Sequence, residues 1–317
     1  MLAFAYGASY AFFSVAANLS SNAPFNIGVT YRVGHLVGFA IALIICMPPI
    51  IFFLKARADK LSVGAVAPPR SAIAASGCAT ALIALTTATA FSFSGVSIIF
   101  ALLLMRGGVL ILAPAIDVFS QRRIRAVSIF ALVISLIIVS VSLLSFDAAV
   151  DGRGLLITLA IYLGAYSVRL NIMSRVAKNA SPGERAAYAR SEFFWAGVFL
   201  VLLVGIALST RVMFLPTAPF SGVAGYSILS GFCYSAVLLF GTLIYLHPKE
   251  NTFTIPINRG ASLVGGMIGA FAGAGFGLTT APSVREAVGA LVILLVLGVL
   301  AAAEKRVDQY TVSKDHQ

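Results

Sequence analysis

The sequence predicts an all-α membrane protein whose ten transmembrane helices form two inverted five-helix repeats. Of its 317 residues, 60% are hydrophobic and only 10% are charged, whereas soluble domains average about 45–50% apolar and about 25% charged residues. The apolar residues fall into stretches of about 20, the length at which a helix crosses a bilayer. In addition, positive charges alternate between successive loops, and an arginine motif recurs five spans apart.

The first five predicted spans occupy residues 1–150, the first half of a single membrane domain. The N-terminal MLAFAYGASYAFF has no basic segment ahead of its apolar run, so no cleaved signal peptide is expected. A polar SSNAPFN turn precedes the second span, and a basic loop separates the second from the third. After a short turn at Ser94 and Gly95 the fourth begins. The expected spans are residues 2–18, 34–54, 72–93, 96–119 and 126–146.

Residues 151–317 hold the second half and a cytoplasmic tail. Ser181 and Pro182 in SPGER are typical of a helix start and open the seventh span. HPKENTF and IPIN separate the eighth span from the ninth. Glycines recur every four residues in the ninth, a ridge against which another helix can pack closely. The expected spans are residues 155–173, the stretch from the helix start in SPGER to about 208, and residues 228–246, 259–278 and 287–303.

The distribution of positive charge predicts the orientation. Sixteen of the twenty lysines and arginines outside the span interiors lie after spans two, four, six and eight and in the tail. Loops rich in lysine and arginine usually remain in the cytoplasm. We therefore expect an even number of spans in the cell (inner) membrane, with both termini cytoplasmic. Because topology accounts for the net charge of +11, nucleic-acid binding is not expected.

Arg106 lies inside the apolar fourth span, in LLLMRGGVLILAPAID. A guanidinium near the bilayer centre costs at least about 2.5 kcal/mol, so such a residue normally faces a bundle interior or a wet cavity. A purely structural arginine is the alternative. Around Arg259, span nine carries Asn-Arg-Gly-Ala-Ser-Leu, which resembles the Met-Arg-Gly-Gly-Val-Leu of span four. Segments five spans apart cross the membrane in opposite directions, as an inverted repeat requires.

Ten short-looped spans, RGGVLILAPAIDVFSQRR at span four and a final PSVREAVGALVILLVLGVLAAAEKR resemble the drug/metabolite transporter superfamily, particularly its EamA-like ten-helix members. The resemblance covers essentially the whole chain. It implies a central cavity lined by spans one to four and six to nine, with spans five and ten at the periphery. The arginines inside the spans depart from the pattern of members that carry neutral solutes.

Several residues are candidates for substrate binding. Arg32 is expected at the outer start of span two, Arg169 in the inner half of span six and Arg259 at the inner start of span nine. Guanidinium groups suit carboxylate or phosphate, so an anionic substrate is inferred. Arg32 and Arg259 could alternatively snorkel to headgroups from the span ends. Three polar residues near Arg169 complete the set, namely Tyr162, Tyr166 and Asn171.

Two residues are candidates for coupling transport to protons. His35 is a candidate because an ordinary imidazole has a near-neutral pKa that would suit coupling, although a lone histidine is more often structural. Glu192, in RSEFFWAG of span seven, either carries protons or neutralises Arg169 or Arg259. We favour the second role for Glu192.

The leading functional interpretation is a secondary-active transporter of a small organic anion or metabolite, working by alternating access with Arg106 and Arg169 as counter-charges. A flippase for an anionic lipid or lipid-linked sugar is a second interpretation, and a non-transporting membrane scaffold subunit is a third. An enzyme is not expected, because HExxH, GxSxG and nucleotide-binding motifs are absent from the sequence. No cofactor or metal is expected, since the three cysteines lack ligand spacing.

Overall fold

The computed structural model describes residues 1–21, 29–61, 70–91, 98–119, 152–178, 180–209, 222–247 and 251–276, with isolated positions at 133, 284, 287–288, 291–292 and 295. Throughout these residues the regular structure is helical and contains no strand, which confirms the all-α prediction. The predicted fifth span lies outside the described residues except for position 133. Most of the predicted tenth span also lies outside them.

The described helices agree with the other predicted spans in order and position. Ser181 and Glu184 form a capping box at the start of the seventh, in which the Ser181 backbone N–H donates to Glu184 Oε2 at 2.8 Å and the Glu184 N–H donates to Ser181 Oγ at 3.3 Å. A short π-helix, η1 (Met173–Ala177), extends the sixth. The α-helices are α1 (Leu2–Ser21), α2 (Val29–Leu61), α3 (Arg70–Ala90), α4 (Ile98–Phe119), α6 (Gly152–Ile172), α7 (Pro182–Ser209), α8 (Gly222–Tyr245) and α9 (Asn251–Gly275).

The distribution of exposed apolar and buried charged side chains differs from that of a soluble protein, which marks the chain as a membrane protein. Large apolar side chains such as Phe4 and Phe52 are 82% and 73% exposed, while Arg106 and Glu192 are buried. An extensive apolar surface, together with charged groups buried in an otherwise apolar core, fits a lipid environment. Five of the described helices are long and apolar enough to cross a membrane, within His35–Lys60, Arg70–Ala90, Arg153–Ala177, Pro182–Ile206 and Gly225–Tyr245.

The start of α9 differs from the prediction. The IPIN segment was expected to be a loop, with Arg259 at the end of the span, but the helix begins at Asn251 and continues through Pro256. Proline is tolerated near the beginning of a helix because the first N–H groups have no partner within the helix, and membrane helices tolerate it further along. Arg259 therefore lies well inside α9 with 0% exposure. It does not snorkel from a span end, and it is not one of the loop charges.

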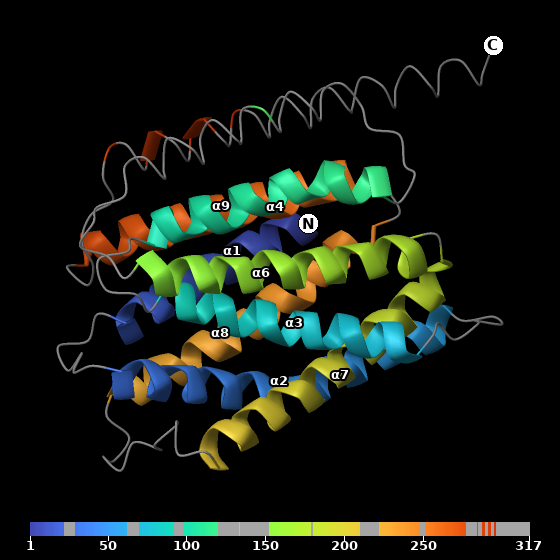
Figure 1. The fold of residues 1–317 in the computed structure, drawn as a ribbon, viewed down its shortest axis with the longest axis horizontal. Helices are drawn as coiled ribbons and strands as arrows, with labels where there is room; N and C mark the ends of the chain where they lie inside the picture. Colours follow the sequence, from blue (N-terminus) through green and yellow to red (C-terminus); the bar gives the residue numbers. More distant parts are fainter. Residues whose placement is uncertain are drawn as a thin grey trace.

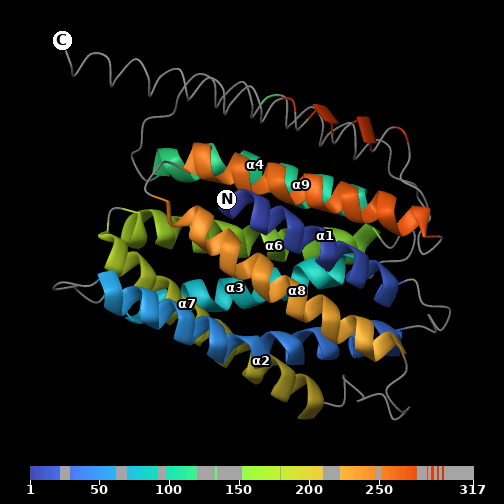
Figure 2. The ribbon, with the colours of Figure 1, turned by 180° about the vertical axis from the view of Figure 1, so that it is seen from behind.

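The described helices form one bundle in which α1–α4 interleave with α6–α9 (Figures 1 and 2). Helix α1 packs against α8 and α9, α2 against α7 and α8, α3 against α6 and α7, and α4 against α6 and α9. The two views agree that α4 and α9 run in opposite directions, as do α1 and α6. Almost every major contact thus joins one helix from residues 1–119 to one from residues 152–275.

Glycines permit the closest of these helix crossings. A Cβ atom at Gly77 of α3 would lie 2.5 Å from Trp195 Cβ and 2.8 Å from the Glu192 carbonyl oxygen of α7. A Cβ at Gly231 of α8 would similarly collide with the Phe39 carbonyl oxygen of α2. Small residues let backbones approach in this way in membrane helix packing. These crossings hold α3 against α7 and α8 against α2.

The predicted glycine ridge of α9 packs against α1. A Cβ added at Gly265 would collide with the Gly7 carbonyl oxygen, and one added at Gly269 would collide with Ser14 Oγ. Both contacts lie on α1, so this part of the ridge serves helix packing, as the sequence indicated. Gly277, the last glycine of the predicted ridge, lies outside the described residues.

We expect Gly77→Ala to destabilise the protein by about 1–3 kcal/mol, because the added methyl group has no space between α3 and α7. Gly205→Ala, on α7, is the matched control, since a Cβ there meets nothing within 4 Å. In a helix that control should be neutral or stabilising by up to about 1 kcal/mol. Thermal unfolding of the purified proteins in detergent measures both effects. Equal stability of the two variants would contradict the packing at Gly77.

Candidate functional site

Arg106 projects from the middle of α4 into the interior of the bundle. Its Nη1 donates to the Tyr162 hydroxyl oxygen of α6 at 3.4 Å, and its guanidinium carbon lies 4.8 Å from the centre of the Tyr10 ring of α1. Only 3% of the residue is exposed, and Nε has no hydrogen-bond partner. The sequence analysis grouped Tyr162 with Arg169, whereas in the structure its hydroxyl accepts from Arg106. The water-filled cavity expected around Arg106 stays a prediction, because the side chain is enclosed in this conformation.

Arg259 approaches the same place from α9. Its Nη1 donates to the Tyr162 hydroxyl oxygen at 3.1 Å, and its Nη2 donates to the Tyr245 hydroxyl oxygen of α8 at 2.6 Å. Its guanidinium carbon lies 4.5 Å from the centre of the Tyr166 ring. Like Arg106, it has a buried Nε without a hydrogen-bond partner. Each arginine therefore stacks on one tyrosine and donates to another.

The Tyr162 hydroxyl joins the two arginines into one site. Since both Nη1 atoms donate to this oxygen, they can be no farther apart than the sum of the two hydrogen-bond lengths. Among the acidic side chains that the structure describes, only Glu192 is buried, and it pairs with Arg169. Within the described part of the chain, two buried guanidinium groups thus share a neutral hydroxyl and have no carboxylate between them.

The tyrosines that surround the arginines follow from helical spacing. Tyr162 and Tyr166 lie four residues apart and so occupy the same face of α6, with ring centres 4.7 Å apart. Tyr6 and Tyr10 have the same spacing on α1, and their ring centres are 6.0 Å apart. The rings offer negative π-faces to the guanidinium groups, which offsets part of the cost of burying them.

Asn258 adds a further unused donor to the site. Its Oδ1 accepts a 2.7 Å hydrogen bond from the Tyr245 hydroxyl, which itself accepts from Arg259. Its Nδ2 is buried without a partner, as are the Nε atoms of Arg106 and Arg259. Three unpaired N–H donors therefore lie in one cluster. A buried donor without an acceptor typically costs about 1–3 kcal/mol, so the arrangement calls for an acceptor that is supplied from outside.

Arg169 belongs to a separate cluster that is internally satisfied. Its Nε donates to Glu192 Oε1 at 2.7 Å, and its Nη2 donates to Glu192 Oε2 at 3.3 Å and to Thr242 Oγ1 at 2.7 Å. Glu192 Oε1 also accepts from the hydroxyls of Ser76 and Thr80, at 2.7 and 2.9 Å. The cluster ties α3, α6, α7 and α8 together. A paired and fully hydrogen-bonded charge is the form in which buried ions are tolerated.

The structure therefore pairs Glu192 with Arg169, one of the two partners that the sequence analysis offered. The counter-charges predicted for substrate were Arg106 and Arg169, whereas the geometry groups Arg106 with Arg259 and leaves Arg169 to Glu192. Tyr245 separates the two clusters, with its ring centre 5.7 Å from the guanidinium carbon of Arg169 and 5.9 Å from that of Arg259.

The remaining candidates are His35, Asn171 and Arg32. His35 is buried in α2, with its Nδ1 3.1 Å from Ser227 Oγ of α8. Asn171 lies in α6, and its Oδ1 is buried without a partner. Arg32 lies near the start of α2, and its side chain is outside the described part of the structure.

Sequence reasoning missed several residues of the site. Tyr10 and Tyr245 lie in apolar stretches, where aromatic residues usually need no special explanation. The four-residue spacing of Tyr6 and Tyr10 in YGASY, which is repeated in YLGAY of α6, was an available signal. Asn258 directly precedes Arg259 in the recurring motif. Ser76 and Thr80 also lie four residues apart, which places both on one face of α3.

No protein-family model matches the chain, and no curated protein matches it in sequence. The resemblance to drug/metabolite transporters therefore rests on the sequence features alone. What the fold and the site define is an all-helical membrane protein with a buried pair of arginines between its two groups of helices.

Proposed function

We propose that the protein is a secondary-active transporter of a small organic anion, which binds between Arg106 and Arg259 and crosses the membrane by alternating access. The observation that carries this proposal is the buried arginine pair, which shares one hydroxyl and has no carboxylate among the described residues. Removing one partner from a buried ion pair typically costs about 3–5 kcal/mol. A substrate anion would supply the missing partner.

The unused donors define the chemistry of that anion. The unpaired groups are hydrogen-bond donors that cannot accept, namely Arg106 Nε, Arg259 Nε and Asn258 Nδ2. A carboxylate or phosphate offers several acceptor lone pairs and matches the planar fork of a guanidinium. The tyrosine rings that flank the arginines provide apolar walls for an organic body. A neutral substrate would leave both charges uncompensated.

Two inverted repeats are part of the proposal, and the helix contacts support them. If α1–α4 are exchanged with α6–α9 in the same order, the contact of α1 with α8 becomes that of α6 with α3. The contact of α1 with α9 becomes that of α6 with α4, and α2 with α8 becomes α7 with α3. The pairs α2–α7 and α4–α9 map onto themselves. Equivalent helices also run in opposite directions in both views.

The site itself follows the same exchange. Arg106 of α4 stacks on Tyr10 of α1, and Arg259 of α9 stacks on Tyr166 of α6. Helix α4 corresponds to α9 and α1 corresponds to α6, so each half contributes one arginine and the tyrosine on which it stacks. Tyr162 and Tyr245 both come from the second half. Binding sites at the interface between inverted repeats are characteristic of secondary transporters.

Ten spans, cytoplasmic termini and membership of the drug/metabolite transporter superfamily complete the proposal. Helices α4 and α6 run in the same direction, so α4 ends and α6 begins at opposite ends of the bundle. This placement is what a chain with one further span between them requires. The basic residues at the ends of α2 and starts of α3 and α7, including Lys55, Arg70 and Arg185, support a cytoplasmic location for that end.

An uptake screen in proteoliposomes tests the proposed function. We expect accumulation or exchange of a carboxylate or phosphate compound, and none of neutral amino acids, with and without an imposed proton gradient. Uptake limited to neutral solutes would contradict the anion site. Movement of labelled anionic lipid between leaflets, without uptake of any soluble anion, would favour a flippase instead.

A further inference from the structure

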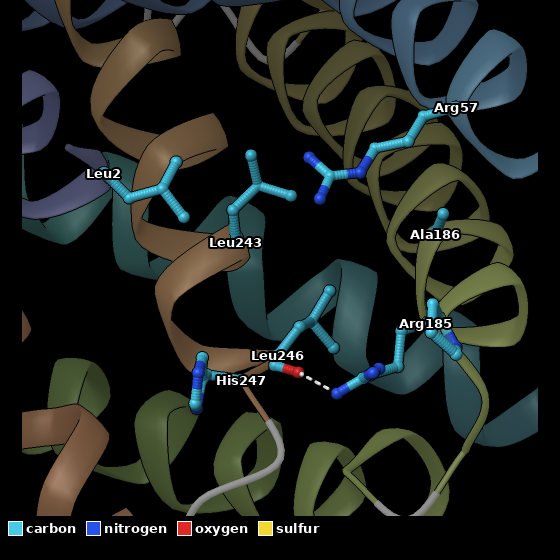
Figure 3. A pocket seen from close by; sticks show the side chains of 8 residues that line it. Leu2, Arg57, Arg185, Ala186, Leu243, Leu246 and His247 are labelled. Atoms are coloured by element: carbon cyan, nitrogen blue, oxygen red, sulfur yellow. Dashed lines mark hydrogen bonds between the residues drawn. The ribbon is translucent and has the colours of Figure 1, made fainter. Parts of the chain in front are cut away.

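A second basic feature lies at one end of the bundle, outside the arginine pair. Here a cavity of about 290 Å³ opens where α2 and α8 end and where α1 and α7 begin (Figure 3). Among the residues that the structure describes, its lining includes Arg57, Arg185 and His247 and no carboxylate. The cavity thus combines positive charge with a defined volume between four helix ends.

The two arginines enter the cavity from one side. Figure 3 shows the guanidinium group of Arg57, from α2, and that of Arg185, from α7, opposite Leu243 and Leu246 of α8. Arg185 Nη1 donates to the Leu246 carbonyl oxygen at 3.3 Å, which fixes the arginine at the rim. Arg57 is exposed, and its guanidinium can therefore bind an ion from solution.

The cavity lies between the two halves and close to the arginine pair. Helices α1 and α2 belong to the first half, and α7 and α8 to the second. Leu243 and Leu246 flank Tyr245, whose hydroxyl accepts a hydrogen bond from Arg259. Leu2 lies four residues before Tyr6, a rise of about 6 Å along α1. Residues that line the cavity and tyrosines of the buried site are therefore neighbours along α1 and α8.

We propose that this cavity is a vestibule in which an anionic substrate, bearing a carboxylate or phosphate group, first binds on the cytoplasmic side. This inference rests on the proposed function and on the orientation proposed with it. Arg57 and Arg185 attract and hold the anion, and Leu2, Leu243 and Leu246 close the way to Arg106 and Arg259. Clefts with charge of one sign and low-dielectric walls concentrate oppositely charged ligands.

The vestibule can be tested without transport, by the rate at which a cysteine inside it reacts. Leu243→Cys is made in the full chain, with Cys46, Cys78 and Cys233 changed to Ala because these part-buried thiols would otherwise contribute. The purified protein in phosphatidylcholine nanodiscs is treated with methanethiosulfonate reagents that carry either a sulfonate or a trimethylammonium group. The measured quantity is the ratio of the anionic to the cationic reaction rate.

We expect this ratio to fall roughly tenfold when Arg57 and Arg185 are both changed to Gln. Arg70→Gln removes a charge from the exposed start of α3, outside the cavity lining, and should leave the ratio nearly unchanged. If Arg185→Gln folds poorly, Arg185→Lys is measured in its place. This variant keeps the charge and should retain most of the preference for the anionic reagent. Succinate and inorganic phosphate should slow modification in the parent and not in the double variant. A ratio that does not depend on Arg57 and Arg185 would overturn the proposal.

A lipid headgroup carries the same phosphate chemistry, and a second arm separates the two sources. Nanodiscs that contain phosphatidylglycerol should leave protection by succinate or phosphate intact if the vestibule serves soluble anions. Loss of the anionic preference on adding this lipid, with no protection by either soluble anion, would overturn the vestibule and assign the arginines to lipid. Labelling needs no transport, so the two proposals can fail separately. If anion uptake depends on Arg106 but the labelling ratio does not depend on Arg57 and Arg185, only the vestibule is rejected. Successful labelling without anion uptake would instead remove the proposed function and leave only an anion-binding cavity.

Discussion

Arg106→Met and Arg259→Met should each abolish transport of the anion while leaving the protein folded at least as well as the parent. Both changes remove a buried charge that has no carboxylate partner among the described residues, and both keep most of the side-chain volume. Since an unpaired buried charge is costly, its removal should maintain or raise the melting temperature. The usual link between lost function and lost stability should therefore be broken at these two positions.

The chemistry of the guanidinium predicts an intermediate result for lysine. Arg106→Lys keeps the positive charge but loses the planar fork and its stacking on Tyr10, so anion transport should fall strongly, though less than in Arg106→Met. Initial uptake rates in proteoliposomes and thermal unfolding in detergent measure the two effects. Arg153→Met, at the exposed start of α6, is the control for losing an arginine elsewhere. Normal transport by Arg106→Met, or failure only through unfolding, would return Arg106 to a structural role.

Glu192→Gln should destabilise the protein by about 3–5 kcal/mol, because the change leaves Arg169 buried without its counter-charge. The amide also cannot accept hydrogen bonds at both of its ends as the carboxylate does from Ser76, Thr80 and Arg169. The loss should appear as a lower melting temperature and a lower yield of monodisperse protein. Replacing Arg169 and Glu192 together by Met should recover most of the stability, since no unpaired charge then remains.

The same variant tests whether Glu192 carries protons. A proton carrier would give a stable Glu192→Gln protein that still exchanges anions but no longer accumulates them in response to a pH gradient. That combination would contradict the structural role proposed here for the Arg169–Glu192 pair. A destabilised variant that regains stability when Arg169 is also replaced would support it.

A feature of the fold or the site can be predicted from the sequence when it has a large free-energy cost that does not depend on its neighbours. Arg106 stood out because a charge inside an apolar span has a large cost, whatever its neighbours are. Its tyrosine partners on α1 and α6 come from distant parts of the chain, and no local pattern specifies which helix faces which. The order and type of the helices could be predicted, but their interleaving could not.

Arg259 shows why span boundaries are harder to predict than spans. The polar HPKENTF segment and Pro256 indicated a loop, yet α9 starts at Asn251 and continues through Pro256, as membrane helices allow. An eight-residue shift moves Arg259 from an interfacial position to the centre of the site. The Arg-Gly motif shared with span four was the better guide, since it compares two arginines directly and does not depend on where the helix begins.

The most direct test of the central claim is a double-mutant cycle on anion affinity with Arg106→Lys and Arg259→Lys. Both single variants and the double variant would be compared with the parent for the anion that the uptake screen identifies. If the two arginines hold one anion, the double variant should lose less affinity than the two single losses combined, by at least about 1 kcal/mol. Losses that add within about 0.5 kcal/mol would show that the arginines act independently and would contradict a shared anion site between the two halves.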